Sequence, residues 1–125
     1  METDLTAKTT LVLGASPNPQ RYSYLAVRNL RAKGIPVIAV GKRLGEVADI
    51  SLQTTFPSGK NVHTVTLYLN AANQQPYETA ILDLRPQRII FNPGAENPGF
   101  AARARKAGIQ TMEACTLVLL STGQY

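Results

Sequence analysis

The first residues that could do chemistry form a short loop between an expected strand, 9–13, and the helix after it. Gly14 permits a tight turn that brings the backbone close to a ligand, and Ser16 and Ser23 supply hydroxyl groups near the helix start. Backbone N–H groups and the helix dipole bind phosphate there, so the loop is a candidate phosphate site. It lacks the full glycine fingerprint of dinucleotide dehydrogenases, because Ser16 and Pro19 occupy the later positions. An ordinary turn with a capping serine is the alternative.

The loop after the second expected strand distinguishes between nucleotides. An NAD site usually has an acidic residue at the end of this strand, where it accepts hydrogen bonds from the adenosine ribose. Here Val40 is followed by Gly41, Lys42 and Arg43. The two cations favour a ribose with an additional phosphate, as in NADP or coenzyme A. The alternative is a solvated basic turn, since lysine and arginine are mostly exposed in any protein.

Two further loops follow expected strands and could enclose a ligand. Asn92, Pro93 and Gly94 combine a fixed turn with a glycine that lets the backbone approach a ligand. Asn70 could form a hydrogen bond to an adenine ring or a phosphate. Both loops could equally be plain turns.

Side chains suited to catalysis or metal binding are sparse. Glu96 and Glu113 have no histidine or second carboxylate beside them, so the sequence shows no acid–base pair. Cys115 follows the last strand and could face the ligand, although a lone cysteine is more often a small buried apolar residue. With one cysteine and one histidine, His63, the chain lacks the ligand cluster of a structural zinc site. We therefore expect a binding protein with no catalytic residue and no metal.

Short aliphatic and β-branched runs alternate with segments of helical periodicity, which is typical of parallel strands connected by helices. This pattern predicts one three-layer α/β domain over residues 1–125, doubly wound around a mainly parallel sheet. The ligand crevice of such a sheet lies beyond the carboxyl ends of its strands, where the loops above should meet. We expect strands at 9–13, 37–40, 64–69, 88–91 and 109–112, and helices at 24–33, 75–84, 98–107 and 115–121. A further short strand at 54–56, and a strand instead of a helix at 116–120, are alternatives.

The overall composition restricts the partners. The 125 residues are 44% hydrophobic and 17% charged, as in an ordinary globular protein. The net charge of +5 would admit nucleic acid, but the few aromatic residues do not form the interleaved pattern of a single-strand binder, so we expect none. No apolar run is long enough to span a membrane, and residues 1–10 show no signal-peptide core. These features predict a cytoplasmic protein whose partner is a small molecule.

Residues along nearly the whole chain match the pattern of a known family. They are Gly14, Ala15, Ser16, Tyr24, Gly34, the basic turn after Val40, residues 92–97 and residues 114–116. Together they resemble the bacterial and archaeal CoA-binding domain family. That family looks like a free-standing version of the N-terminal domain of the succinyl-CoA synthetase α-subunit, which implies a Rossmann-like fold and CoA as the ligand.

The resemblance also implies roles for individual residues. Lys42, with Arg43 beside it, would lie near the adenosine 3′-phosphate of CoA, and Asn70 and residues 92–94 would complete the rim of the site. The CoA phosphates would lie against Gly14, Ala15, Ser16, Arg21 and Ser23.

The sequence departs from the family at two places. Members commonly have Val-Asn-Pro after the second strand, where this chain has Val40, Gly41 and Lys42. Many members have a glutamine at the position of Asn92, and a cysteine is common at the position of Cys115. The first departure leaves the choice of nucleotide open.

These observations favour a protein that binds CoA and senses or delivers CoA or acyl-CoA. Independent catalysis is not expected, because ligation in the synthetase needs a phosphohistidine segment and a nucleotide-grasp subunit that this chain does not contain. One alternative is an NADP-linked reductase-type domain. Another is a regulatory adaptor, bound to a partner protein or forming a homodimer, whose pocket is vestigial.

Overall fold

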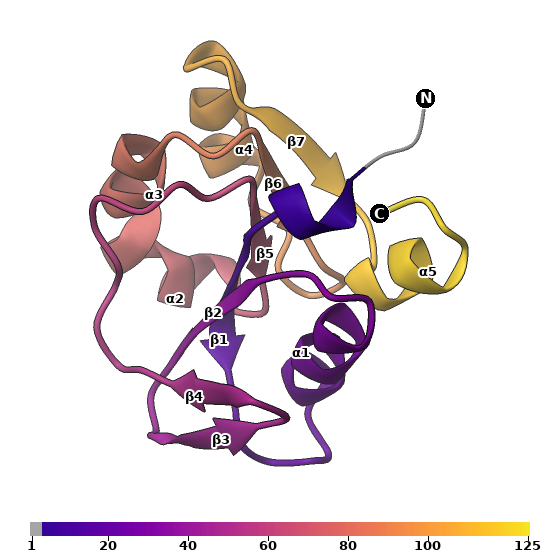
Figure 1. The fold of residues 1–125 in the computed structure, drawn as a ribbon. Helices are drawn as coiled ribbons and strands as arrows, with labels where there is room; N and C mark the ends of the chain where they lie inside the picture. The colour runs from indigo at the N-terminus through magenta and orange to yellow at the C-terminus, as the bar shows by residue number, and fades with distance from the viewer. Residues whose placement is uncertain (1–3) are drawn as a thin grey trace.

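A sheet of five parallel strands lies at the centre of the computed structural model, which describes residues 4–125. The strands are β1 (Thr10–Ala15), β2 (Val37–Gly41), β5 (Thr64–Leu67), β6 (Arg88–Phe91) and β7 (Gln110–Glu113). They lie in the order β2-β1-β5-β6-β7 (Figure 1). Side chains on both faces of β1, β5 and β6 are buried, which is why these strands read as nearly continuous apolar or β-branched runs.

Helices cover both faces of this sheet. The helices are α1 (Tyr22–Ala32), α5 (Thr116–Ser121), α3 (Glu78–Leu84) and α4 (Pro98–Lys106), and a short 3-10 helix (Leu5–Ala7) precedes β1. On one face α1 and α5 share a core cluster that contains Val27 and Leu120. On the other, α3 and α4 share a cluster that contains Ile81 and Phe100. The predicted three-layer, doubly wound α/β architecture is confirmed.

The direction in which the chain winds changes beside β1. From β1 the chain passes through α1 to β2 on one side, and then crosses to β5 on the other side of β1. The carboxyl ends of all five strands lie at the lower edge of the sheet in Figure 1. A doubly wound sheet opens a crevice where its winding reverses, here between the ends of β1 and β5.

Several element boundaries differ from the expected ones. β1 continues to Ala15 through a bulge at Gly14, and α1 begins at Tyr22, two residues earlier than expected. The expected segment 115–121 is a helix, α5, and not a strand. An additional short helix, α2 (Ala71–Gln74), and a 3-10 turn (Gln75–Tyr77) precede α3. Asn70 starts α2, because its Oδ1 accepts a hydrogen bond from the N–H of Asn73 at 2.9 Å.

The expected strand at 54–56 is wrong. Two strands of three residues each, β3 (Gly45–Val47) and β4 (Ile50–Leu52), instead form an antiparallel hairpin earlier in the chain. Polar residues alternate with apolar ones in this hairpin. A residue far away in the sequence stabilises it: the Arg31 guanidinium on α1 donates two hydrogen bonds to the Asp49 carboxylate, at 2.9 and 2.8 Å. The same contact lowers the pKa of Asp49. A partner 18 positions away in the chain is invisible to local periodicity.

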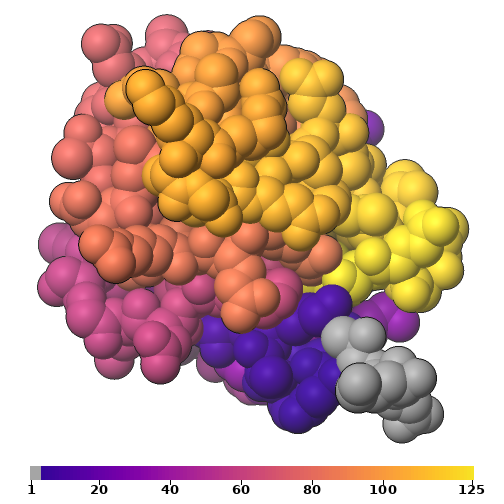
Figure 2. All heavy atoms as spheres, turned by 90° about the horizontal axis from the view of Figure 1, so that it is seen from above, coloured from indigo at the N-terminus to yellow at the C-terminus, as the bar shows by residue number. Residues whose placement is uncertain are grey.

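Arg88 and Lys8 form a cationic cluster at the amino edge of the sheet. This edge of the molecule faces the viewer in Figure 2. The Arg88 side chain is buried, stacks over the Tyr125 ring at 4.3 Å and donates from Nε to the Thr64 hydroxyl at 2.7 Å. The Lys8 ammonium donates to the Tyr125 carbonyl at 2.7 Å, so the first and last segments of the fold lie side by side. Burial and the charges of Arg88 and Lys8 lower the pKa of His63 below its usual 6.5.

Among residues 4–125, no helix has the length and apolar character that a bilayer crossing requires. The first three residues of the expected domain 1–125 lie outside the described part of the chain.

The lowered pKa of His63 predicts a loss of stability in mild acid. As the pH is lowered below 6.5, the unfolded chain takes up a proton on His63 before the folded protein does. The free energy of unfolding therefore decreases as the pH is lowered, until His63 is protonated in the folded state too. His63→Gln should remove this component and flatten the pH dependence just below 6.5. Urea unfolding at a series of pH values measures it, and identical slopes for the two proteins would contradict the assignment.

Candidate functional site

A cleft of about 910 Å³ opens at the carboxyl edge of the sheet, over the ends of β1 and β5. Four segments line it: the loop after β1 with the start of α1, the end of β2, the loop after β5, and the loop after β6. The volume lies within the range of small-molecule sites, roughly 300–1,000 Å³. The cleft therefore occupies the position that the winding of the chain predicts for a ligand.

The structure brings together all of the expected site residues except Asn92 and Cys115. Those that line the cleft are Gly14, Ala15, Ser16, Arg21, Ser23, Lys42, Arg43, Asn70, Pro93 and Gly94.

The loop after β1 is shaped by its own hydrogen bonds. The Ser16 hydroxyl accepts from the N–H of Asn18, and the Asn18 side chain accepts from the N–H of Gln20, both at 3.0 Å. Gly14 has a φ of +91°, and a Cβ there would lie 3.0 Å from the carbonyl group of Tyr68. Gly14 thus allows the loop to turn tightly over the end of β5.

The start of α1 is open toward the cleft. Its N-cap residue, Arg21, makes no side-chain capping hydrogen bond. The N–H groups of Tyr22 and Ser23 have no acceptor within the helix, as at any helix start, and both residues line the cleft. Such a terminus attracts anions through its free donors and its dipole.

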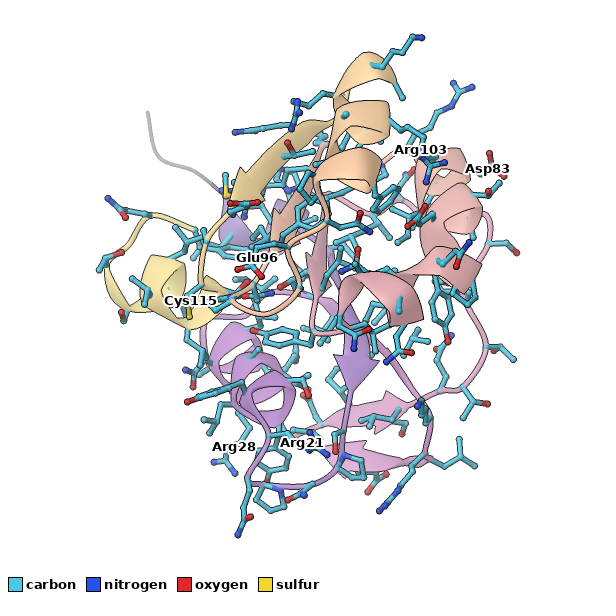
Figure 3. The ribbon with its side chains drawn as sticks, turned by 180° about the vertical axis from the view of Figure 1, so that it is seen from behind. Arg21, Arg28, Asp83, Glu96, Arg103 and Cys115 are labelled. Atoms are coloured by element: carbon cyan, nitrogen blue, oxygen red, sulfur yellow. The ribbon has the colours of Figure 1, made fainter. Side chains whose placement is uncertain are left out.

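Every charged side chain that lines the cleft is a cation. Arg21 stands at the start of α1, at the end of the molecule toward which the strands point (Figure 3). Lys42 and Arg43 follow β2, are exposed and form no ion pair within residues 4–125. The cleft therefore has a positive end, formed by the start of α1 and the end of β2, that suits a ligand with several phosphates.

Gly41 explains why the end of β2 lies so close to the end of β1. A Cβ at this position would lie only 2.0 Å from the carbonyl oxygen of Ala15. Since that oxygen belongs to the backbone, no side-chain rotation could relieve the clash. Packing in this chain therefore requires a glycine at position 41.

The other end of the cleft is uncharged. Its lining comes from residues after β5 and β6, among them Tyr68, Asn73, Pro76, Tyr77 and Ala95. The hydroxyl oxygen of Tyr68 points into the protein and is buried there. It makes no hydrogen bond within residues 4–125. Burial raises the pKa of Tyr68, so this phenol is neutral.

Asn92 requires a correction, because its side chain points into the core and not toward the rim. It is 2% exposed, and its amide donates to the Thr66 hydroxyl at 2.7 Å and to the Leu67 carbonyl at 2.9 Å. Its Oδ1 accepts from the N–H of Thr116 at 2.9 Å. Asn92 thus fastens β5, β6 and the start of α5 to one another.

Cys115 also lies apart from the cleft lining. It is the half-buried N-cap residue of α5 and makes no capping hydrogen bond through its side chain. In Figure 3 it lies at the start of α5, well separated from Arg21. The structure therefore does not bring it to the positive end of the cleft.

Sequence reasoning missed Gln74, which is completely buried behind the uncharged end of the cleft. Its side chain forms hydrogen bonds to the loops after β5 and β6. The only sequence signal is a polar residue between expected elements, which is too common to identify it.

No lining residue is an aspartate, glutamate, histidine or cysteine. Within residues 4–125 no three such side chains gather in a way that could hold a metal ion. The chemistry of this arrangement is the electrostatic and hydrogen-bonded capture of an anion.

These features define a Rossmann-like nucleotide-binding domain with a cationic cleft. A family model described as a CoA binding domain matches residues 8–121. The chain therefore belongs to this family of CoA-binding domains. The match indicates coenzyme A and lends no support to NADP.

Several solved structures resemble this chain in fold. One uncharacterized protein is 43% identical, with a TM-score of 0.91 and coverage of 94% of this chain and 98% of its own. A Thermus thermophilus protein is 24% identical, with a TM-score of 0.83 and coverage of 94% of this chain and 90% of its own. A hypothetical protein from Pyrococcus horikoshii OT3 is 19% identical, with a TM-score of 0.83 and coverage of 92% of this chain and 82% of its own. These two share the fold. No curated protein matches the chain.

Replacing Gly41 by alanine should separate the end of β2 from the end of β1. Because the new methyl group would meet the Ala15 carbonyl, we expect Gly41→Ala to lower the free energy of unfolding by about 1–3 kcal/mol. Gly99→Ala is the matched control, since its Cβ would have no atom nearer than 4.0 Å and alanine favours the helix α4. Denaturant unfolding compares them, and equal stabilities of the two variants would refute the packing role of Gly41.

Proposed function

We propose that the protein binds coenzyme A in this cleft and senses or delivers CoA or acyl-CoA, without catalysing a reaction of its own. One observation carries the proposal: the uncapped start of α1 opens into a cleft whose charged lining residues are all cationic. CoA carries a pyrophosphate and a 3′-phosphate, and family membership indicates CoA among the nucleotides with these groups.

The pyrophosphate would lie against the loop from Gly14 to Ser16 and the N–H groups at the start of α1. A Rossmann-like fold holds a pyrophosphate at this place, because the first helix directs its free donors there. Arg21, at the same helix start, would contribute a charge-assisted hydrogen bond.

The adenosine 3′-phosphate would lie at the end of β2, beside Lys42 and Arg43. In folds of this type the adenosine ribose lies near the end of the second strand. Two cations there, which form no ion pair within residues 4–125, are suited to a phosphate on that ribose and offer nothing specific to an unphosphorylated one.

A role without catalysis is supported by the chemistry of the lining. Arginine, lysine, tyrosine and serine are its ionisable or hydroxyl side chains, and none of them has a carboxylate or imidazole of the lining to act as its base. A bound CoA or acyl-CoA would be held intact and could be presented to another protein.

Ligand-dependent thermal unfolding tests the choice of nucleotide. CoA, dephospho-CoA, NADP and NAD are added at equal concentrations, and a ligand that binds the folded state raises the midpoint according to its saturation. We expect the largest rise with CoA and a smaller rise with dephospho-CoA. Absence of any shift with CoA would refute the proposal, and a larger shift with NADP than with CoA would refute the choice of ligand.

Charge removal at the end of β2 tests where the 3′-phosphate lies. Lys42→Ala and Arg43→Ala should each weaken CoA binding about tenfold and leave dephospho-CoA binding nearly unchanged. Arg28→Ala is the matched control, because Arg28 is an exposed cation of α1 outside the cleft lining. Titration calorimetry gives the dissociation constants. Equal losses for CoA and dephospho-CoA would show that these cations act on the ligand as a whole and not on its 3′-phosphate.

A further inference from the structure

Gln74, at the end of α2, is the one glutamine side chain in the buried core of residues 4–125. It is 0% exposed, although a buried amide must satisfy both donors and its acceptor to avoid a substantial loss of stability. Its Nε2 donates to the Leu69 carbonyl at 2.8 Å and to the Ala95 carbonyl at 2.7 Å. Its Oε1 accepts from the Asn97 side chain at 2.9 Å.

The two carbonyl groups belong to neighbouring loops at the uncharged end of the cleft, since β5 and β6 are adjacent in the sheet. Leu69 lies in the loop after β5 and Ala95 in the loop after β6, and both residues line the cleft. Because one amide nitrogen binds both carbonyls, the geometry of a single side chain sets the spacing of the two loops.

The amide is itself held in place from behind. Asn97 caps α4, since its Oδ1 accepts from the N–H of Phe100 at 3.2 Å, while its amide donates to Gln74 and, at 3.2 Å, to Glu78. Glu78 in turn forms an ion pair with Arg103 on α4. A continuous polar network thus ties α2, α3 and α4 to the loops of the cleft, and such a network stabilises one orientation of its members.

The distribution of charge orients a ligand along the cleft. Cations occur only at the end formed by α1 and β2, and the loops that Gln74 joins contribute no charged lining residue. CoA has the matching polarity, with three phosphates at one end and a long, uncharged pantetheine arm with two amide groups at the other. If CoA binds as proposed above, its phosphates occupy the positive end and its arm extends along the uncharged end, over the two loops that Gln74 joins.

We propose that Gln74 is a positioning residue for the pantetheine arm of CoA. It sets the distance between the loops after β5 and β6, and so shapes the uncharged end of the cleft without touching the ligand. The inference rests on the proposed function. It predicts that Gln74 contributes to the affinity for CoA but not to the affinity for the nucleotide half of CoA alone.

The test compares CoA with adenosine 3′,5′-bisphosphate, which lacks the pantetheine arm. Gln74→Met keeps a similar side-chain volume and removes all three hydrogen bonds. We expect it to weaken CoA binding about tenfold or more and to change bisphosphate binding less than about twofold. Gln87→Met is the matched control, because Gln87 is exposed at the opposite edge of the sheet, and it should bind both ligands as the unaltered protein does.

A second variant keeps the test decisive if Gln74→Met does not fold. Gln74→Glu retains an acceptor for Asn97 but, when ionised, offers no donor to the two carbonyl groups. Its protonated form can donate one hydrogen bond. CoA affinity of this variant, relative to the unaltered protein at each pH, should therefore recover as the pH is lowered, with bisphosphate affinity unaffected.

Three outcomes would overturn the inference or its basis. Unchanged CoA affinity in the Gln74 variants, or equal losses for CoA and the bisphosphate, would show that Gln74 only stabilises the fold. Failure of the unaltered protein to bind CoA would instead refute the proposed function, and the control measurement on that protein separates this result from the other two.

Discussion

The burial of β1 between β2 and β5 is the constraint on which the rest of the molecule depends. Leu11, Val12 and Leu13 are at most 1% exposed, so neighbouring strands and helices must cover both edges and both faces of this strand. The chain satisfies this requirement by winding to one side of β1 and then to the other. The reversal opens the cleft at the carboxyl end of β1, and the bulge at Gly14 turns the following loop across it.

Buried amide side chains join the loops of the cleft to one another and to the core. Asn92 joins β5 and β6 to α5, and Gln74 joins the loop after β5 to the loop after β6. Each amide is buried, and breaking its hydrogen bonds would leave polar groups unsatisfied in a medium of low dielectric constant. Loops that would otherwise be mobile therefore have a defined spacing, and the uncharged half of the cleft is formed before a ligand arrives.

The positive half of the cleft has a different physical basis. Arg21, Lys42 and Arg43 are exposed and solvated, so their mutual repulsion costs little when no ligand is present. A polyanion that enters the cleft meets these charges together with the free N–H groups at the start of α1. Preformed loops at one end of the cleft and solvated cations at the other combine shape selection with electrostatic attraction.

Local patterns in the chain were enough to predict the five strands of the central sheet, the helices α1, α3, α4 and α5, and the sheet edge at which the cleft opens. Periodicity, turn residues and helix caps are properties of neighbouring residues, so they can be read without the fold. The β3–β4 hairpin, the inward orientation of Asn92 and the role of Gln74 could not be read in this way. The Arg31 contact to the hairpin, the Asn92 contacts to Thr66 and Leu67 and the Gln74 contact to Ala95 join atoms 18 to 26 positions apart, which folding alone brings within hydrogen-bonding distance.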